Sequence, residues 1–330
     1  MIEAHGLSKR YGPKTAVDDV SFTVRPGVVT GFLGPNGAGK STTMRLAMGL
    51  DRPSAGWVTV NGKPYAQHRS PLTEVGALLE AKAVHPGRSA YQHLRVLAAT
   101  HDFPTRRVDE VIELTGLESV ATKRVGGFSL GMGQRLGIAA ALLGDPKTLI
   151  LDEPVNGLDP EGVLWVRNLA RYLAGEGRTV FLSSHLMSEV ALTADHVLVI
   201  GKGKILADTP VKDLVDGASR RVVRVRTPQA TELAEALRRE GLGVEAKDDG
   251  FLEVSGTEAA HVGEVAAAHT VVLHELTPVA TTLEDAYMAL TADAVEYHTE
   301  DVTERLGHGL GESAGEAVPA ATAPTEGADR

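Results

Sequence analysis

The first sixty residues alternate short apolar runs with turn-forming residues. Apolar stretches at residues 2–5, 20–24 and 28–33 are separated by Tyr11-Gly12-Pro13 and Pro26-Gly27. Runs of this length between glycine and proline are typical of β-strands joined by tight turns. We therefore predict that these three runs form hairpin-linked antiparallel strands.

The pattern then becomes helical. Leucine and valine recur every three or four residues from 89 to 117, and Ser89 with Gln92 has the spacing of a capping box. We expect a small helical subdomain over about residues 85–143. Beyond it the pattern predicts alternating strands and helices, which is typical of a parallel sheet, at residues 148–151, 162–174, 179–183 and 197–200.

A new series of strand and helix signals begins near residue 216. Strand and helix signals alternate again up to residue 292, which predicts a small α+β accessory domain over 216–292 after a first domain over 1–215. Residues 293–330 hold nine acidic side chains and two arginines, and so carry most of the formal net charge of −10. This segment has little apolar content, so we expect an acidic, disordered tail.

Composition narrows the class of protein. The chain has no cysteine, which excludes disulfides and zinc–thiolate sites and leads us to expect a cytoplasmic location. No signal-peptide pattern opens the chain, and no apolar run approaches the roughly 18–20 residues that a membrane span needs. The acidic balance argues against a general nucleic-acid surface. We therefore expect any membrane role to depend on partner proteins.

A glycine-rich loop follows the apolar run at 28–33 and precedes helix-compatible residues. It matches the pattern G-x-x-x-x-G-K-[ST] with Gly34, Pro35, Asn36, Gly37, Ala38, Gly39, Lys40 and Ser41. Such a loop points backbone amides at a phosphate group, and the following helix adds the positive end of its dipole. Lys40 would reach the β- and γ-phosphates, Ser41 would bind Mg²⁺, and Thr42 would support the α-phosphate. The alternative is a glycine-rich turn with a chance lysine.

Two adjacent acids, Asp152 and Glu153, end the apolar run at 148–151. The carboxyl edge of a parallel sheet would bring both carboxylates beside the glycine-rich loop. Asp152 could hold Mg²⁺ through water, and Glu153 could orient the water that attacks the γ-phosphate. The alternative for an isolated pair is a solvated acidic turn.

Five motifs in fixed order resemble the nucleotide-binding subunits of ABC transporters. They are residues 34–42, Ser129-Leu-Gly-Met-Gly-Gln-Arg135, residues 149–154, Asn156-Gly-Leu-Asp159-Pro160 and Ser183-Ser-His185. The resemblance covers about residues 1–215 and implies an α/β P-loop fold. It would comprise an antiparallel β subdomain, a parallel-sheet core and a helical subdomain, followed here by the small C-terminal α+β domain.

The resemblance also implies roles for single residues. Tyr11 would stack on adenine, and Asp159 would link the two sites of a dimer. Ser129 and Gly131 would contact the γ-phosphate of ATP held by a second copy, and His185 would contact it within its own copy. The plain alternatives are a surface tyrosine, a turn aspartate and a structural histidine.

Two departures from the common family pattern are informative. In the family's signature motif, which corresponds here to residues 128–132, Leu130 and Met132 replace a glycine and a glutamine. Glu80 stands where a glutamine usually senses Mg²⁺ and the membrane subunit. Glu80 keeps an oxygen ligand for the metal. Both changes, and the ending at residues 282–287, resemble the branch of daunorubicin-resistance and lantibiotic or bacitracin exporters.

The sequence therefore predicts an ATP-hydrolysing subunit that pairs with itself and with integral membrane permeases at the cytoplasmic face of the cell membrane. Its expected cofactors are ATP and Mg²⁺, and its expected role is export of a drug, antibiotic or peptide. The alternative is a soluble ABC ATPase acting on nucleic acid or the ribosome, although such proteins usually carry two cassettes or a long coiled coil. A P-loop kinase or GTPase would lack the motifs around Ser129 and His185.

Overall fold

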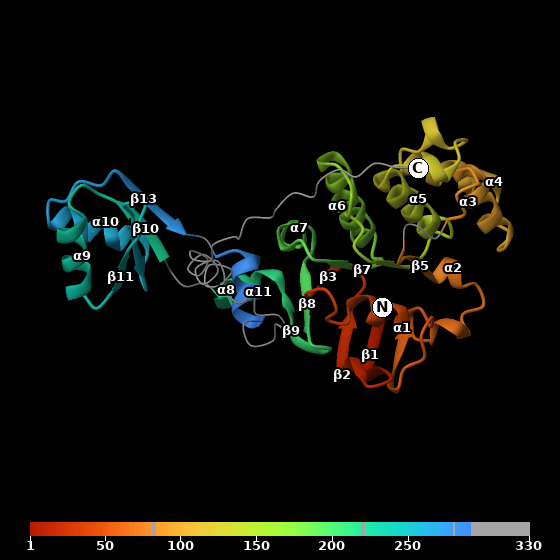
Figure 1. The fold of residues 1–330 in the computed structure, drawn as a ribbon, viewed down its shortest axis with the longest axis horizontal. Coiled ribbons are helices and arrows are strands. Elements are labelled where there is room, and N and C mark those ends of the chain that lie inside the picture. The colour runs from red at the N-terminus through yellow and green to blue at the C-terminus, as the bar shows by residue number, and fades with distance from the viewer. Residues whose placement is uncertain (81–83, 219–221, 280, 292–330) are drawn as a thin grey trace, which may run out of the picture. The chain divides into compact units, whose positions relative to one another are not determined.

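A computed structural model describes residues 1–80, 84–218, 222–279 and 281–291. The tail predicted at residues 293–330 lies outside these ranges. Two sheets build the first part of the chain (Figure 1). An antiparallel sheet has the order β2-β1-β4, with bounds Lys14–Val24, Ile2–Tyr11 and Ala55–Val60.

The larger sheet has the order β5-β6-β7-β3-β8-β9. Its strands pair in parallel, except for the antiparallel pair of β8 and β9. The bounds in that order are Val75–Leu78, Thr148–Leu151, Thr179–Ser184, Val29–Leu33, His196–Gly201 and Lys204–Pro210.

Strand β3 corrects one prediction. β1 and β2 do form an antiparallel hairpin, but the run at 28–33 does not join it. Instead β3 lies between β7 and β8 and runs parallel to both. All five of its residues are buried, as expected for a strand covered on both faces. A continuous apolar run, unlike an alternating one, therefore marked the central strand of the parallel sheet.

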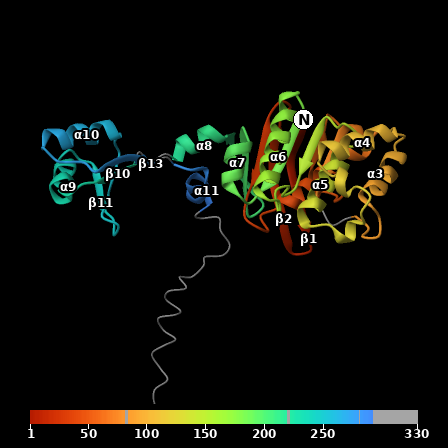
Figure 2. The same ribbon diagram turned by 90° about the horizontal axis from the view of Figure 1, so that it is seen from above.

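Helices cover the sheets as the pattern predicted. Helix α1 (Lys40–Ala47) follows β3, and α6 (Pro160–Gly175) and α7 (Met187–Thr193) flank β7 in the chain. Three helices within the predicted helical subdomain, α3 (Ala90–Ala99), α4 (Thr105–Leu114) and α5 (Leu130–Leu142), pack side by side (Figure 2), while its bounds at about 85 and 143 stay a prediction. A short helix, α2 (Pro71–Glu74), precedes β5.

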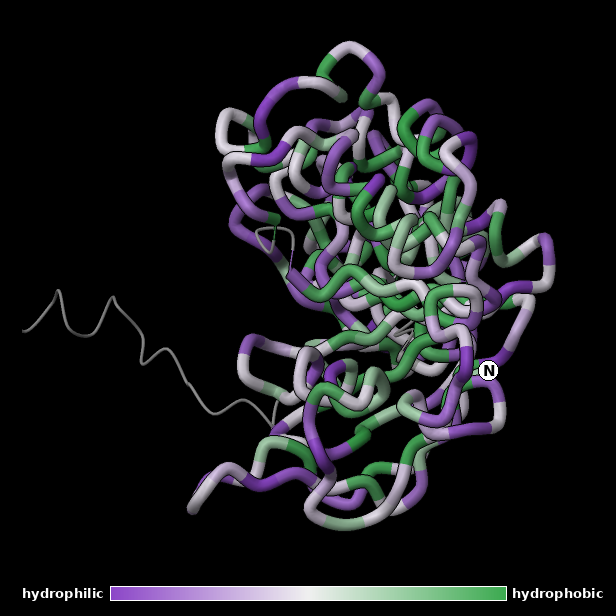
Figure 3. The backbone as a smooth tube through the Cα atoms, turned by 90° about the vertical axis from the view of Figure 1, so that its right-hand side faces the viewer, coloured by the Kyte–Doolittle hydropathy of each residue, from purple (hydrophilic) through white to green (hydrophobic). Residues whose placement is uncertain are grey.

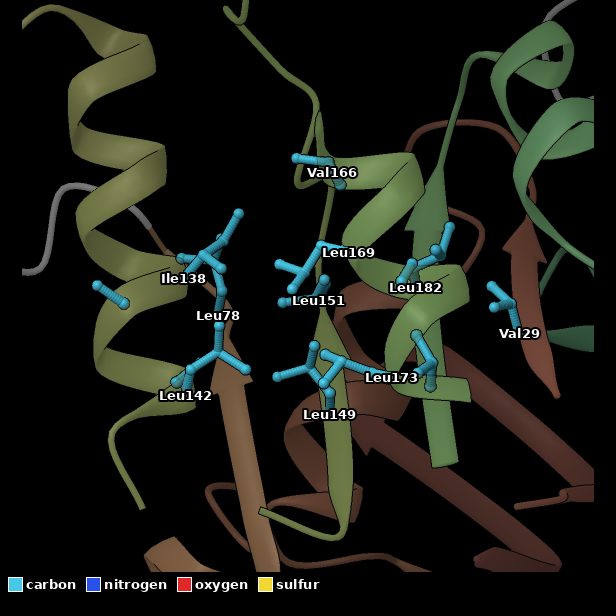
Figure 4. Packing of buried hydrophobic residues seen from close by; sticks show 14 of the residues in the cluster. Val29, Leu78, Ile138, Leu142, Leu149, Leu151, Val166, Leu169, Leu173 and Leu182 are labelled. Atoms are coloured by element: carbon cyan, nitrogen blue, oxygen red, sulfur yellow. The ribbon is translucent and has the colours of Figure 1, made fainter. Parts of the chain in front are cut away.

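The main core is aliphatic. Figure 4 shows Leu78 of β5 against Ile138 and Leu142 of α5, while Leu169 and Leu173 of α6 lie over β6. Close approach fixes α5, because a Cβ on Gly76 would lie 2.0 Å from the carbonyl oxygen of Ala141. Along the backbone, hydrophobic stretches alternate with hydrophilic ones (Figure 3).

The accessory region has its own sheet and its own core. Four antiparallel strands have the order β11-β12-β10-β13, and two helices, α9 and α10, give the chain order β-α-β-β-α-β. Val223, Val225, Leu233 and Val262 belong to its separate hydrophobic cluster. The bounds in chain order are Val222–Arg226, Ala230–Arg239, Gly243–Ala246, Leu252–Ser255, Ala259–Ala268 and Glu275–Val279.

Two helices bracket this accessory sheet in the chain. α8 (Val211–Ala218) precedes it and α11 (Leu283–Thr291) follows it, and the two helices pack together. Leu283 and Tyr287 of α11 are buried in the main core, where α11 also contacts α7. The domain boundaries at 215 and 292 stay a prediction, but α11 packs with the first part of the chain rather than with the accessory core.

No helix among the described residues combines the length and the apolar character required to cross a bilayer.

Candidate functional site

The glycine-rich loop connects β3 to α1, as predicted. A Cβ on Gly34 would lie 2.5 Å from the carbonyl oxygen of Ile200, and one on Gly39 would lie 2.5 Å from that of Ala16. Gly39 also has φ +114°, a conformation that side chains rarely adopt. The loop therefore needs glycine at both ends to pack against β2 and β8.

A cavity of about 340 Å³ opens beside this loop. Its lining comes from three separate parts of the chain and comprises Tyr11, Lys14, Ala16, Pro35, Asn36, Gly37, Gly39, Lys40, Ser41, Thr42 and Glu153. Gly34 and Ala38 do not line it, and the side chain of Ala38 is buried behind the loop. The structure thus brings most of the predicted phosphate-binding residues to one cavity together with Glu153.

Lys40 is held inside the curl of the loop. Its Nζ donates to the carbonyl oxygen of Gly34 at 2.6 Å and lies 3.7 Å from Oε1 of Glu153, an ion pair too long for a hydrogen bond. The side chain is 6% exposed. Burial lowers the pKa of Lys40 from its usual value, more than the nearby charges of Glu153 and Asp152 raise it.

Glu153 also contacts His185, the residue that the sequence predicts to meet the γ-phosphate. Its Oε2 accepts a hydrogen bond from Nδ1 of His185 at 2.7 Å and another from the His185 backbone N–H at 3.3 Å. β6 and β7 are parallel neighbours, so their carboxyl ends meet at one edge of the sheet. This arrangement joins Lys40, Glu153 and His185 into one chain of contacts.

Two residues with no predicted role hold this centre. The hydroxyl of Ser183 donates to Oδ1 of Asp152 at 2.5 Å and accepts from the backbone N–H of Glu153 at 2.9 Å. The side-chain amide of Gln134 donates to the carbonyl oxygen of Glu153 at 2.9 Å. Both residues stand inside motifs that the sequence singled out, yet only their spatial position reveals what they bind.

Two further residues that the sequence did not single out, Lys14 and Ala16 of β2, line the cavity. Lys14 comes directly after the turn that joins β1 to β2. The signal available was a cation close to Tyr11 across a two-residue turn.

Ser129, Gly131 and Asp159 do not line the cavity beside the glycine-rich loop of their own chain. Ser129 is exposed and caps α5 by accepting from the backbone N–H of Met132 at 3.2 Å. Asp159 caps α6 by accepting from the N–H of Gly162 at 2.9 Å. Both caps follow the local rule that short polar side chains satisfy the first amides of a helix.

Tyr11 lies with 45% of its surface exposed. Its hydroxyl donates to Asp51 at 3.0 Å, and Nζ of Lys9 lies 4.8 Å from the ring centroid. Burial of the hydroxyl, followed by the hydrogen bond to Asp51, raises the pKa of Tyr11. The ring is therefore fixed at the cavity with much of its surface accessible to a planar ligand.

Glu80 follows β5, so it leaves the sheet at the same edge as Asp152, but it is exposed and does not line the cavity. In the described part of the chain, no group of three or more histidine and carboxylate side chains could hold a metal. Mg²⁺ in phosphoryl-transfer sites is bound largely by phosphate oxygens and waters. The hydroxyl of Ser41 with the carboxylate of Asp152 fits that type of binding.

Comparison with known proteins gives two family matches. A family model described as "ABC transporter" matches residues 17–156. A second model, described as a domain of unknown function, matches residues 221–284.

Curated relatives are similar over most of the chain. An uncharacterized ABC transporter ATP-binding protein, YhcH of Bacillus subtilis, is 36% identical over 305 residues, 90% of this chain and 97% of the relative. The bacitracin transport ATP-binding protein BcrA of Bacillus licheniformis is 41% identical over 65% of this chain and 71% of its own. The lantibiotic transport ATP-binding protein SrtF of Streptococcus pyogenes is 36% identical over 63% and 90%.

Solved structures agree in fold. An ATP-binding subunit of an ABC transporter has a TM-score of 0.60 at 26% identity, over 66% of this chain and 92% of that one. The cassette MJ0796, a dimer in a post-hydrolysis state with ADP and Pi, has a TM-score of 0.58 at 20% identity, over 64% and 98%.

Proposed function

Because this chain belongs to the ABC transporter family as an ATP-binding protein, we propose that two copies bind MgATP between them and energise export through separate membrane subunits. The chain has the ABC ATPase fold and is an ATPase.

The observation that carries the proposal is the contact chain from Lys40 through Glu153 to His185 beside the glycine-rich loop. Lys40 would hold the β- and γ-phosphates, and Glu153 would orient the attacking water. His185, which donates to the same carboxylate, would fix the orientation of Glu153 and meet the γ-phosphate. Phosphoryl transfer depends on such positioning because its loose transition state requires alignment more than covalent help.

Ser41 and Asp152 would hold Mg²⁺, and Glu80, which is exposed after the end of β5, would supply a further oxygen ligand. The bound metal would neutralise charge on the phosphate oxygens. The hydrogen bond from Ser183 orients Asp152 for this role.

The position of residues 129–131 supports a role for a second copy. Ser129 and Gly131 stand at the start of α5, a 13-residue helix whose N-terminus favours an anion, but they lie outside the cavity of their own chain. The γ-phosphate they would bind therefore belongs to ATP held by a partner copy. The dimeric state reported for the similar cassette MJ0796 supports this arrangement.

The membrane partner and the substrate rest on the relatives. Their names give bacitracin and lantibiotic transport, so we propose an antibiotic or peptide as the exported substrate. The substrate path would lie in permease subunits, with this chain bound to them at the cytoplasmic face of the membrane.

Co-purification tests the proposal directly. Glu153→Gln keeps the size of the side chain but removes its charge, so it should still bind MgATP, hydrolyse it far more slowly and accumulate as a closed dimer. Membranes solubilised with and without MgATP should then yield a polytopic membrane protein in fixed ratio to this variant. Glu176→Gln, which changes an exposed carboxylate bonded to Tyr172 and Arg178, is the matched control with normal turnover.

Recovery of ribosomes or DNA in place of a membrane protein would instead support the soluble ATPase. Unchanged turnover of Glu153→Gln would refute the role given to that carboxylate.

A further inference from the structure

The backbone of Glu153 adopts a left-handed conformation with φ +50°. A residue with a side chain adopts this conformation at a cost in free energy and keeps it only where surrounding contacts hold it. Two side chains and one backbone amide supply these contacts. Ser183 accepts from the N–H of Glu153, and the carbonyl oxygen of Glu153 accepts from the side chain of Gln134 at 2.9 Å and from the N–H of Asn156 at 3.2 Å.

Gln134 reaches Glu153 from a different element, helix α5. Its side chain is 5% exposed, and the bond must come from its amide nitrogen because a carbonyl oxygen can only accept. Gln134, Ile138 and Leu142 are spaced by four residues, so they share one face of the helix. Figure 4 shows Ile138 and Leu142 on this face packed around Leu78 of β5.

The position of α5 is tightly fixed at this point. A Cβ on Gly137 would lie 2.5 Å from Cδ1 of Leu78, so the helix and β5 already touch. The amide of Gln134 is therefore presented by a rigid element, and the carbonyl of Glu153 is held relative to that element.

We propose that Gln134 is a positioning residue that keeps Glu153 in its left-handed conformation and so places the carboxylate between Lys40 and His185. The inference rests on the proposed role of Glu153 in hydrolysis. Without the bond from Gln134, the carbonyl of Glu153 keeps only the longer bond from the N–H of Asn156, so the backbone relaxes and the carboxylate leaves the position from which it orients water. Gln134 does not line the cavity beside the glycine-rich loop, so nucleotide binding is spared.

Gln134→Met tests this idea because methionine keeps the length and the helix propensity of glutamine but cannot donate. We expect kcat for ATP hydrolysis to fall about 10- to 100-fold, the range that follows from misplacing a reacting group by about 1 Å. KM for MgATP should stay within about twofold of the wild-type value, and the MgATP-bound dimer should accumulate as it does for Glu153→Gln.

Arg135→Met is the matched control. Arg135 is the next residue of the same helix, and it donates to the carbonyl oxygen of Thr115 and lies over the ring of Trp165, away from Glu153. Its loss should weaken packing without lowering kcat more than about twofold. An equal loss of kcat in both variants, or an unchanged kcat in Gln134→Met, would overturn the proposal.

A second variant covers the possibility that Gln134→Met folds poorly. Gln134→Glu has the shape of the natural residue, but it can donate to the carbonyl of Glu153 only when its carboxyl is protonated. Its kcat relative to wild type should therefore recover wherever the carboxyl is protonated, whereas a ratio that stays low at every pH would count against the positioning role.

The double variant separates this inference from the proposed function. If Gln134 acts through Glu153, adding Gln134→Met to Glu153→Gln should leave the residual rate unchanged, because the positioned group is already absent. A further loss in the double variant would overturn the inference alone. Full activity of Glu153→Gln by itself would overturn both the inference and the assigned role of Glu153.

Discussion

Because the glycine-rich loop packs closely against β2, Gly39 is the glycine of the site that should tolerate a side chain least. It has φ +114°, and an added Cβ would lie 2.5 Å from the carbonyl oxygen of Ala16 and 3.2 Å from Cδ1 of Ile200. Gly37, two residues earlier in the same loop, has φ +82° but no heavy atom within 4 Å of its added Cβ. The pair Gly39→Ala and Gly37→Ala therefore separates overlap from backbone strain.

The expected losses in the free energy of unfolding follow from backbone strain and from overlap. Placing alanine at a positive φ costs about 1–3 kcal/mol in either variant, and no less at Gly39 than at Gly37. Overlap with a backbone carbonyl adds about 1–3 kcal/mol at Gly39 alone, because β2 must move to make room. With an m-value of about 3 kcal/mol/M in urea, the midpoint of Gly39→Ala should lie about 0.3–1 M below that of Gly37→Ala.

Tryptophan fluorescence is a suitable assay. Both tryptophans of the chain, Trp57 in β4 and Trp165 in α6, lie in the first part of the chain, so their signal reports on the part that contains the loop. Equal midpoints for the two variants, or a lower midpoint for Gly37→Ala, would refute the argument that the loop is pressed against Ala16.

Three further predictions follow from individual contacts. Asp159→Ala should lower the free energy of unfolding by about 1 kcal/mol because it removes the N-cap of α6, whereas Asp159→Asn should keep most of it; equal losses in urea unfolding would contradict the cap. Tyr287→Ala should cost about 3–5 kcal/mol because the side chain is 5% exposed, and should speed hydrogen exchange in α11 and α7; unchanged protection of α7 would argue against their packing. Burial lowers the pKa of Lys40 in the folded state, so the unfolded chain binds this proton more tightly and the contribution of Lys40 to stability rises as pH increases from the folded to the unfolded pKa. The stability of wild type minus that of Lys40→Met should rise across this range of pH, and a fall would reverse the assigned cause.

Much of the fold could be predicted because its signals lie within single elements. The caps at Ser89 and Ser129 depend on residues three positions away in the chain, and both are present. The strand, loop and helix around Gly39 are confirmed, as is a small region of mixed strands and helices beyond residue 222. Periodicity and capping are local, so the chain carries them without reference to its tertiary structure.

Pairing between distant strands was harder to predict. The apolar run that became β3 looked like a third hairpin strand, yet it pairs with β7 and β8, which come more than 140 residues later. The sequence near β3 does not indicate which strands it pairs with. The same reason explains α11, which ends the accessory region in sequence but buries Tyr287 in the main core.

The site divides in the same way. The sequence by itself determined which residues we propose for the chemistry, because Lys40, Asp152, Glu153 and His185 stand in motifs whose spacing is local. Only the tertiary structure decided how they meet: parallel strands end at one edge, Glu153 joins Lys40 to His185, and Gln134 and Ser183 hold its backbone. These contacts cross between elements, so they depend on packing that no short stretch of sequence can specify.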